Sequence, residues 1–179
     1  MEITSMNFTG HRPQDLGGYD ESNPMNVWVK QQLAKCIVGF HKKYGTREWI
    51  TGLALGVDQW AAEVVLWLKE NEGLDLYLVG MKPFTSQHIK WNERSQERFH
   101  RICELCDELI ICQPDPYAPW KMDYRNKEMV NRAKATLAVW SGKSGGTGNC
   151  VKYAHSRKKP IYRIDPITKT LFWEREIEE

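Results

Sequence analysis

Hydrophobic positions along the chain follow two spacings, one typical of strands and one of amphipathic helices. Short apolar or β-branched runs predict strands at 3–8, 48–51, 74–81, 108–112, 136–140 and 160–164. Apolar residues at three- and four-residue steps predict helices at 25–44, 57–71, 86–105, 123–134 and 150–157. A further edge strand is expected at 170–173, and the charged stretch 174–179 is expected to fray.

The alternation of strand and helix predicts an α/β fold with three layers, α/β/α, around a mainly parallel sheet of about six or seven strands. The run 108–112 is almost continuously apolar, which is typical of a parallel strand buried on both faces. No linker divides the chain, so we expect a single domain over 1–179, with 165–179 as a C-terminal edge strand and tail.

Composition narrows the class of protein. Hydrophobic residues make up 41% of the 179 residues, which excludes a disordered chain. No apolar run reaches the ~18 residues of a membrane span, and residues 1–4 show no secretory signal. The formal net charge of +2 does not favour bulk binding of nucleic acid, so we expect a cytoplasmic protein without a membrane partner and consider nucleic acid an unlikely partner.

The five cysteines are an odd number and include the pair Cys103 and Cys106, three residues apart. A zinc site requires about four ligands, and no second cluster with suitable spacing follows. We therefore expect free, mostly buried thiols in a reducing compartment, and no metal or cofactor.

Loops rich in small residues follow several predicted strands. These loops are 10–13, 52–58, 80–84 and 141–149, and all should lie at the carboxyl edge of the sheet, where open parallel sheets bind ligands. The loop after the fifth strand holds Ser141, Gly142, Gly145, Gly146 and Thr147 before a helix expected from about Asn149. Glycines expose backbone N–H groups, and a helix N-terminus attracts anions, so a phosphate site is predicted, with a simple turn as the alternative.

The other strand ends contribute side chains of three kinds. Arg12 can grip a phosphate bidentately and His11 can donate or accept near neutral pH, although both could instead pair with carboxylates. Small residues at Gly10, Gly52, Ala54 and Gly56 allow close approach of a helix or a ring. Asp58 either caps the following helix or contacts a ribose hydroxyl, and Trp60 either stacks on a base or belongs to the core.

Aromatic residues mark a possible wall of the same pocket. Pro83 and Phe84 end the third strand, and Trp91 follows, either at the pocket or at a subunit contact. The region of Tyr117, Trp120 and Tyr124 precedes Arg125 and Asn126, and it is either a lid or a packed connection.

Four motifs in order resemble one family. The stretches 10–13 and 51–63, the pair Arg125-Asn126 followed by Met129-Val130, and Val139-Trp140 leading to 145–147 together resemble the YpsA-like branch of the SLOG superfamily, which includes the DprA/Smf proteins and the "lonely guy" (LOG) phosphoribohydrolases. The resemblance implies a Rossmann-like fold and a pocket for a nucleotide-derived ligand. ADP-ribose-like molecules, including signals in bacterial antiphage immunity, belong to the range of such domains.

One departure weakens an enzymatic assignment. The LOG hydrolases carry a glutamate on the helix after the glycine-rich loop, whereas Gly148, Asn149, Cys150 and Val151 follow Thr147 here. Glycosidic cleavage generally uses a carboxylic acid or carboxylate, which only Asp58 or Glu63 could supply from another strand.

Three functions remain in order of preference. The first is binding of a nucleotide-derived small molecule, an ADP-ribose-like or cyclic nucleotide signal, by a sensor, regulator or sequestering protein that forms a homo-oligomer. The second is a nucleotide N-glycosidase or phosphoribohydrolase. The third is a DprA-like nucleic-acid-binding module, supported only by the basic runs 157–159 and Arg94 with Arg98 and Arg101.

Overall fold

A computed structural model describes residues 2–177. The strands are β1 (Ser5–Gly10), β2 (Glu48–Thr51), β3 (Tyr77–Lys82), β4 (Glu108–Ile111), β5 (Ala135–Val139), β6 (Ile161–Asp165) and β7 (Thr170–Arg175). The helices are α1 (Pro24–Tyr44), α2 (Val57–Asn71), α3 (Glu93–Leu105), α4 (Pro119–Arg132) and α5 (Gly146–Ser156), with a short 3₁₀ helix η1 (Pro13–Asp15).

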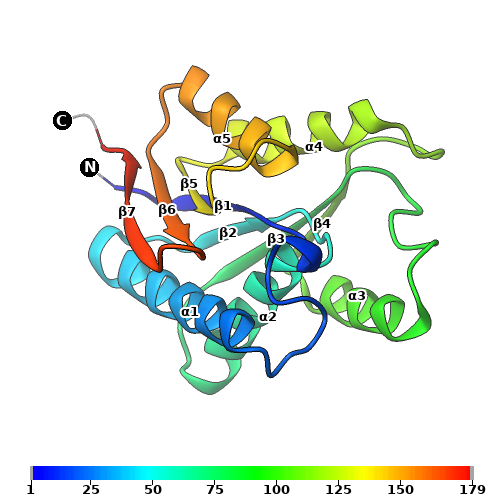
Figure 1. The fold of residues 1–179 in the computed structure, drawn as a ribbon, viewed down its shortest axis with the longest axis horizontal. Helices are drawn as coiled ribbons and strands as arrows, with labels where there is room; N and C mark the ends of the chain where they lie inside the picture. The colour runs from blue at the N-terminus through cyan, green and yellow to red at the C-terminus, as the bar shows by residue number, and fades with distance from the viewer. Residues whose placement is uncertain (1, 178–179) are drawn as a thin grey trace.

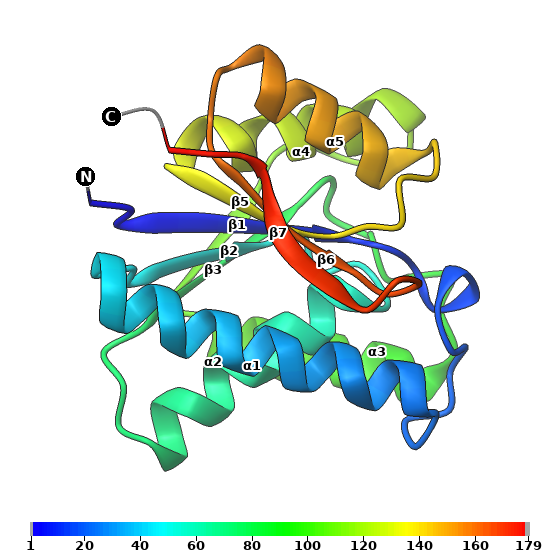
Figure 2. The same ribbon diagram turned by 60° about the vertical axis from the view of Figure 1, so that its left-hand side comes forward.

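The strands form a seven-stranded sheet in the order β4-β3-β2-β1-β5-β6-β7, parallel except for β7, which pairs antiparallel with β6. Helices α1, α2 and α3 cover one face, and α4 and α5 cover the other, as Figures 1 and 2 show. The predicted three-layer α/β fold with a mainly parallel sheet is therefore confirmed. The chain moves outward from β1 to β4 and then returns to β5, so the direction of winding reverses between the neighbouring strands β1 and β5.

The central strands are buried on both faces, and the main core lies between the sheet and α1 and α2. Phe8 of β1 stacks on Trp49 of β2 with ring centroids 5.1 Å apart, inside this core. Gly10 allows α2 to approach β1 closely, because a Cβ there would lie 2.5 Å from Val57 Cγ1. This contact brings the start of α2 beside the carboxyl end of β1.

The prediction that 108–112 is buried was wrong. β4 is parallel to β3 but lies at the edge of the sheet, with Leu109 43% and Ile111 49% exposed. An apolar run indicates a strand, but its position in the sheet order depends on all the other strands.

Three helices begin well before or after the predicted residue, and the other helix boundaries differ from prediction by at most two residues. α3 begins at Glu93 rather than residue 86, because the Asn92 side chain caps it by accepting from Ser95 N–H at 2.8 Å. α4 begins at Pro119 rather than residue 123, since proline is well suited to a first helical position. α5 begins at Gly146 rather than at residues 149–150, so much of the predicted glycine loop forms the first turn of a helix.

The C-terminal edge strand expected at 170–173 is longer than predicted. β7 extends to Arg175, so the expected fraying at 174 and 175 was wrong, and residues 178–179 lie outside the described part of the chain. None of the helices within residues 2–177 is both long and apolar enough to cross a membrane.

Candidate functional site

A cavity of about 570 Å³ lies at the carboxyl ends of the central strands, next to the reversal between β1 and β5. One side consists of residues after β1 and the first turn of α5, and the other side consists of residues after β3 and from α4. The predicted site residues that line it are Gly10, His11, Arg12, Ala54, Asp58, Phe84, Trp91, Arg125, Asn126, Gly145, Gly146 and Thr147. The strand-end loops therefore meet around one hollow.

The first turn of α5 presents backbone N–H groups to this cavity. Gly145 is the N-cap residue with φ 144°, a value that only glycine adopts readily, and the first helical bond runs from Asn149 N–H to Gly145 O at 2.8 Å. The N–H groups of Gly146 and Thr147 precede that bond, so the helix supplies no acceptor for them. Among residues 2–177, apart from the chain neighbours and the backbone of α5 itself, no heavy atom lies within 4 Å of a Cβ position at Gly145 or Gly146. The helix end is therefore open to an anion.

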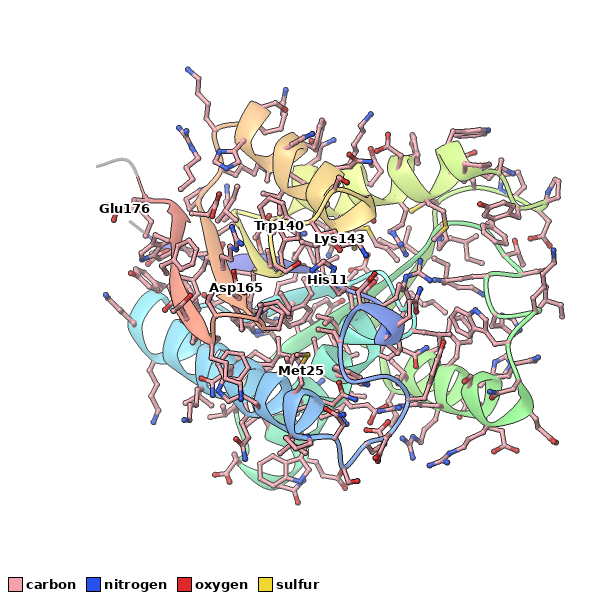
Figure 3. The ribbon with its side chains drawn as sticks, in the orientation of Figure 1. His11, Met25, Trp140, Lys143, Asp165 and Glu176 are labelled. Carbon is pink, nitrogen blue, oxygen red and sulfur yellow. The ribbon has the colours of Figure 1, made fainter. Side chains whose placement is uncertain are left out.

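His11 joins the loops that follow β1 and β5. Its Nε2 accepts a hydrogen bond from Ser141 N–H at 3.0 Å and lies 3.0 Å from Ser141 Oγ. This assigns the neutral tautomer with the proton on Nδ1, and burial lowers the pKa of the imidazole below its ordinary value of 6.5. Figure 3 shows His11 and Lys143 near the beginning of α5. His11 therefore holds the loop in place, which was one of its two predicted roles. Its partner is Ser141, however, and not a carboxylate.

This arrangement predicts a pH dependence of stability. Because the pKa of His11 is lower in the folded chain than in the unfolded chain, its contribution is complete above about pH 6.5 and is lost as the pH falls below that value. We expect His11→Gln, whose amide reaches as far as Nε2, to unfold with a weaker pH dependence between pH 7.5 and 5.5. Urea unfolding of both proteins across that range measures the difference, and parallel curves for the two proteins would contradict it.

Arg12 lines the cavity and is half-buried. Within residues 2–177 its guanidinium makes no hydrogen bond or ion pair, although it lies close enough to Asp58 and Arg125 to influence their charge. Lys143 also lines the cavity. It donates a 2.6 Å hydrogen bond to Asp15 Oδ1 and so links the glycine-rich loop to η1. The alternative that Arg12 pairs with a carboxylate is not what the structure shows.

Two buried, oppositely charged residue types, Arg125 and Asp58, lie at the floor of the cavity. Arg125 Nη1 donates to Gly52 O and, at 3.2 Å, to Met81 O, so it caps the carboxyl ends of β2 and β3. Asp58 is 7% exposed, and its Oδ2 accepts from Ala54 N–H at 3.4 Å. Burial raises the pKa of Asp58, which Arg125 and Arg12 oppose, and burial lowers the pKa of Arg125, which Asp58 opposes.

Several predicted residues lie behind the cavity wall rather than in it. These are Gly52, Gly56, Pro83, Ser141, Gly142 and Asn149. Gly52 supports the floor through its carbonyl, and Ser141 orients His11. The backbone of Gly56 packs against His11, where a Cβ would lie 2.7 Å from the carbonyl oxygen. These residues shape the site without lining it.

Glu63 does not belong to the cavity. It accepts hydrogen bonds from Arg98 and lies 3.9 Å from Arg101, in a second, surface hollow between α2 and α3. Glu63 is on the second turn of α2, where the helix has already turned away from the strand ends. Of the two carboxylates predicted for the site, Asp58 and Glu63, Asp58 is therefore the one that lines the cavity.

Packing decides the alternative for Trp60 and places two other predicted aromatic residues at the cavity. Trp60 is in the core with Lys30 Nζ 5.0 Å from its ring centroid, so it is not a stacking platform. Trp91 lines the cavity and packs edge-on against Phe99 at 5.4 Å. Tyr117 lies at the cavity and contacts Phe84 at 5.7 Å. Trp120, expected in the loop, is on α4 and away from the cavity.

The cysteines are free thiols, and burial raises the pKa of Cys103 to about 11 and of Cys106 to about 12. Such thiols are poor nucleophiles and poor metal ligands at neutral pH. In the described part of the chain, no group of three or more His, Cys, Asp or Glu side chains is placed to hold a metal ion.

Sequence reasoning did not select twelve of the lining residues as site residues. They are Thr9, Gln14, Asp15, Ser86, Gln87, Ile89, Lys90, Tyr117, Met122, Met129, Lys143 and Ser144. Lys143 and Ser144 lie within the predicted loop 141–149, where Lys143 could supply a positive charge to a phosphate, and Asp15 lies two residues after the predicted loop 10–13. Nothing in the sequence indicated a site role for Gln87. A helix was predicted over 86–105, whereas the first part of this stretch is an irregular segment that folds over the strand ends.

The sheet order and the cavity at its reversal define a Rossmann-like α/β protein. Two solved structures share this fold: DNA processing protein A (DprA) from Helicobacter pylori, reported for its single-stranded DNA binding mode, and DprA from Streptococcus pneumoniae. The TM-scores are 0.61 and 0.62, at 15% and 12% identity over 92% and 91% of this chain. The chain spans 66% of the first protein and 50% of the second.

Relatives in sequence identify the family. A UPF0398 protein of Brevibacillus brevis is 30% identical over 88% of this chain and 86% of its own length. The SPbeta prophage-derived protein YoqJ of Bacillus subtilis is 30% identical over 74% of this chain and 83% of its own length. The YpsA model, described as the YspA SLOG family, matches residues 6–170. The chain therefore belongs to the YpsA family of SLOG proteins, as its motifs predicted.

Proposed function

We propose that this protein binds a nucleotide-derived small molecule, such as ADP-ribose, and acts as a sensor, regulator or sequestering protein. One observation carries the proposal: the unpaired guanidinium of Arg12 and the open first turn of α5 line the same cavity. A phosphate between them would accept bidentate hydrogen bonds from Arg12 and backbone hydrogen bonds from Gly146 and Thr147.

The rest of the cavity suits the remainder of such a ligand. Phe84, Ile89, Trp91 and Tyr117 form an apolar and aromatic wall opposite the glycine-rich loop. A volume of about 570 Å³ is within the usual range for small-molecule sites. An aromatic base or a ribose can therefore occupy the wall side while a phosphate occupies the start of α5.

One observation favours a second candidate, N-glycosidic cleavage. Asp58 lines the cavity, and burial raises its pKa, which is the direction of shift that a general acid requires. Long incubation with AMP or ADP-ribose followed by chromatography distinguishes the two functions. Release of free adenine that is abolished by Asp58→Asn supports the enzyme, whereas recovery of intact ligand supports binding alone.

The first prediction concerns Arg12. In calorimetry with ADP-ribose and AMP, Arg12→Ala should weaken binding by about 10- to 100-fold, because a charge-assisted hydrogen bond to phosphate is lost. Arg157→Ala is the matched control, since Arg157 is exposed at the far end of α5 and should leave binding unchanged.

A second variant tests the helix end separately. Gly146→Ala adds a methyl group where no protein atom lies within 4 Å, so the fold should be preserved while the approach of a phosphate is blocked. Failure of every nucleotide to bind the wild-type protein, or equal binding by Arg12→Ala and wild type, would reject the proposal. Binding of single-stranded DNA that Arg12→Ala weakens, without binding of nucleotides, would replace it with a nucleic-acid function.

A further inference from the structure

The buried amide of Gln87 is a feature of the cavity that the phosphate site leaves unexplained. Gln87 lines the cavity and is 8% exposed, and its Oε1 is buried without a hydrogen-bond partner among residues 2–177. Buried side-chain oxygens in folded proteins nearly always accept a hydrogen bond. An acceptor that lacks a protein donor, on a residue that lines a cavity, is a place where a ligand can supply the donor.

The orientation of this amide is determined by the backbone behind it. Gln87 Nε2 donates to Gly52 O at 3.0 Å. Exchanging the two ends of the amide would place Oε1 against the carbonyl oxygen of Gly52, so that two acceptors would meet without a proton. Nε2 must therefore stay on Gly52, and Oε1 remains the free end.

A second acceptor lies beside the same glycine. A Cβ on Gly52 would be 2.9 Å from Asp58 Oδ2 and 2.5 Å from Arg125 Nη1, which shows how closely both side chains pack against it. Arg125 directs Nη1 at the carbonyls of Gly52 and Met81 and Nε at Asn126 Oδ1. Gln87 and Asp58 thus place acceptors in the part of the cavity that Arg125 also lines.

We propose that Gln87 Oε1, with Asp58 beside it, selects a ligand that carries a neutral hydrogen-bond donor, either a hydroxyl or an amino group. This inference rests on the proposed function, because it assigns a part of the same ligand. At this position a phosphate oxygen would meet the amide oxygen acceptor to acceptor, whereas a hydroxyl or amino group would donate to it. In a nucleotide the donor is a ribose hydroxyl or the exocyclic amine of the base, and both have the chemistry that the amide oxygen recognises.

The test compares parent ligands with analogues that lack one donor. Calorimetry would use ADP-ribose and AMP, their 2′-deoxy and 3′-deoxy analogues, and the analogues with a 6-oxo group in place of the adenine amine. We expect wild-type protein to bind one class of analogue about three- to tenfold more weakly than its parent, which identifies the donor.

Variants assign that preference to Gln87. Gln87→Met keeps the length of the side chain and removes the acceptor, so it should bind the parent and that analogue equally. Gln31→Met is the matched control, because Gln31 is exposed on α1 and should retain the wild-type preference. Thermal unfolding of each variant shows that it is folded at the temperature of the titration.

The outcomes separate this inference from the proposed function. If the parent binds and every analogue binds equally well to wild-type protein, the inference is wrong and the proposed function stands. If Gln87→Met keeps the wild-type preference, another residue reads the donor and the inference is again wrong. If neither ADP-ribose nor AMP binds wild-type protein, both proposals are overturned.

Discussion

Arg125→Met is expected to destabilise the protein by about 1–3 kcal/mol, because it removes a buried hydrogen-bond donor and the cation that most strongly favours the charged form of the buried Asp58. It removes the donor to Met81 O, whereas Gly52 O keeps the hydrogen bond from Gln87. The loss of stability caused by Arg125→Met should become smaller as the pH is lowered, since a protonated Asp58 requires no opposing charge. Urea unfolding at several pH values measures both effects.

A double-mutant cycle assigns this loss to the pair. Asp58→Asn removes the charge while keeping the shape of the side chain, so Arg125→Met combined with Asp58→Asn should be less destabilised than the two single changes added together. We expect a coupling free energy of about 1 kcal/mol or more. Strict additivity would show that Arg125 stabilises the fold through the strand carbonyls alone.

The glycine at the start of α2 gives the second large effect. Gly56 has φ 89° and ψ −132°, a conformation that residues with a side chain rarely adopt, and a Cβ there would lie 2.7 Å from His11 O. Gly56→Ala should therefore destabilise the protein by more than about 2 kcal/mol, through both strain and the clash with the backbone. Thermal unfolding should show a decrease of at least about 4 °C.

A glycine without these constraints is available as a control. Gly39 lies inside α1, and no atom lies within 4 Å of its Cβ position. Gly39→Ala should stabilise the protein by about 0.5–1 kcal/mol, because alanine is the better helix former. Equal thermal shifts for the two substitutions would contradict the structural role of Gly56.

The accuracy of the sequence predictions follows the strength of local signals. Strand 48–51 and helix 57–71 were predicted with their observed boundaries, because glycines flank the strand and the helix has a clear apolar face. The start of α3 was wrong because residues 86–91 have helix-compatible composition but are held by tertiary bonds. Ser86 N–H, for example, donates to Asp115 Oδ1 at 2.8 Å across 29 residues.

The candidate site divides in the same way. Gly145, Gly146 and Arg12 could be selected from the sequence, because small or cationic residues directly after a strand have a position that topology predicts. Gln87 could not, since its role depends on a hydrogen bond to Gly52, 35 residues away. Glu63 was selected from the sequence, but its place on the second turn of α2 directs it to Arg98 instead.

The sequence by itself determined the class of fold, the edge of the sheet where the strand-end loops meet, and the family, because periodicity and strand-end motifs are local properties of the chain. Only the tertiary structure decided which side chains meet at the cavity, which ones pair with other residues instead, and where β4 lies in the sheet. The physical reason is that burial, desolvation and unpaired donors or acceptors arise from contacts between distant segments. Asp58 of α2, Arg125 of α4 and Gln87 after β3 acquire their chemistry only when the fold brings them together around Gly52.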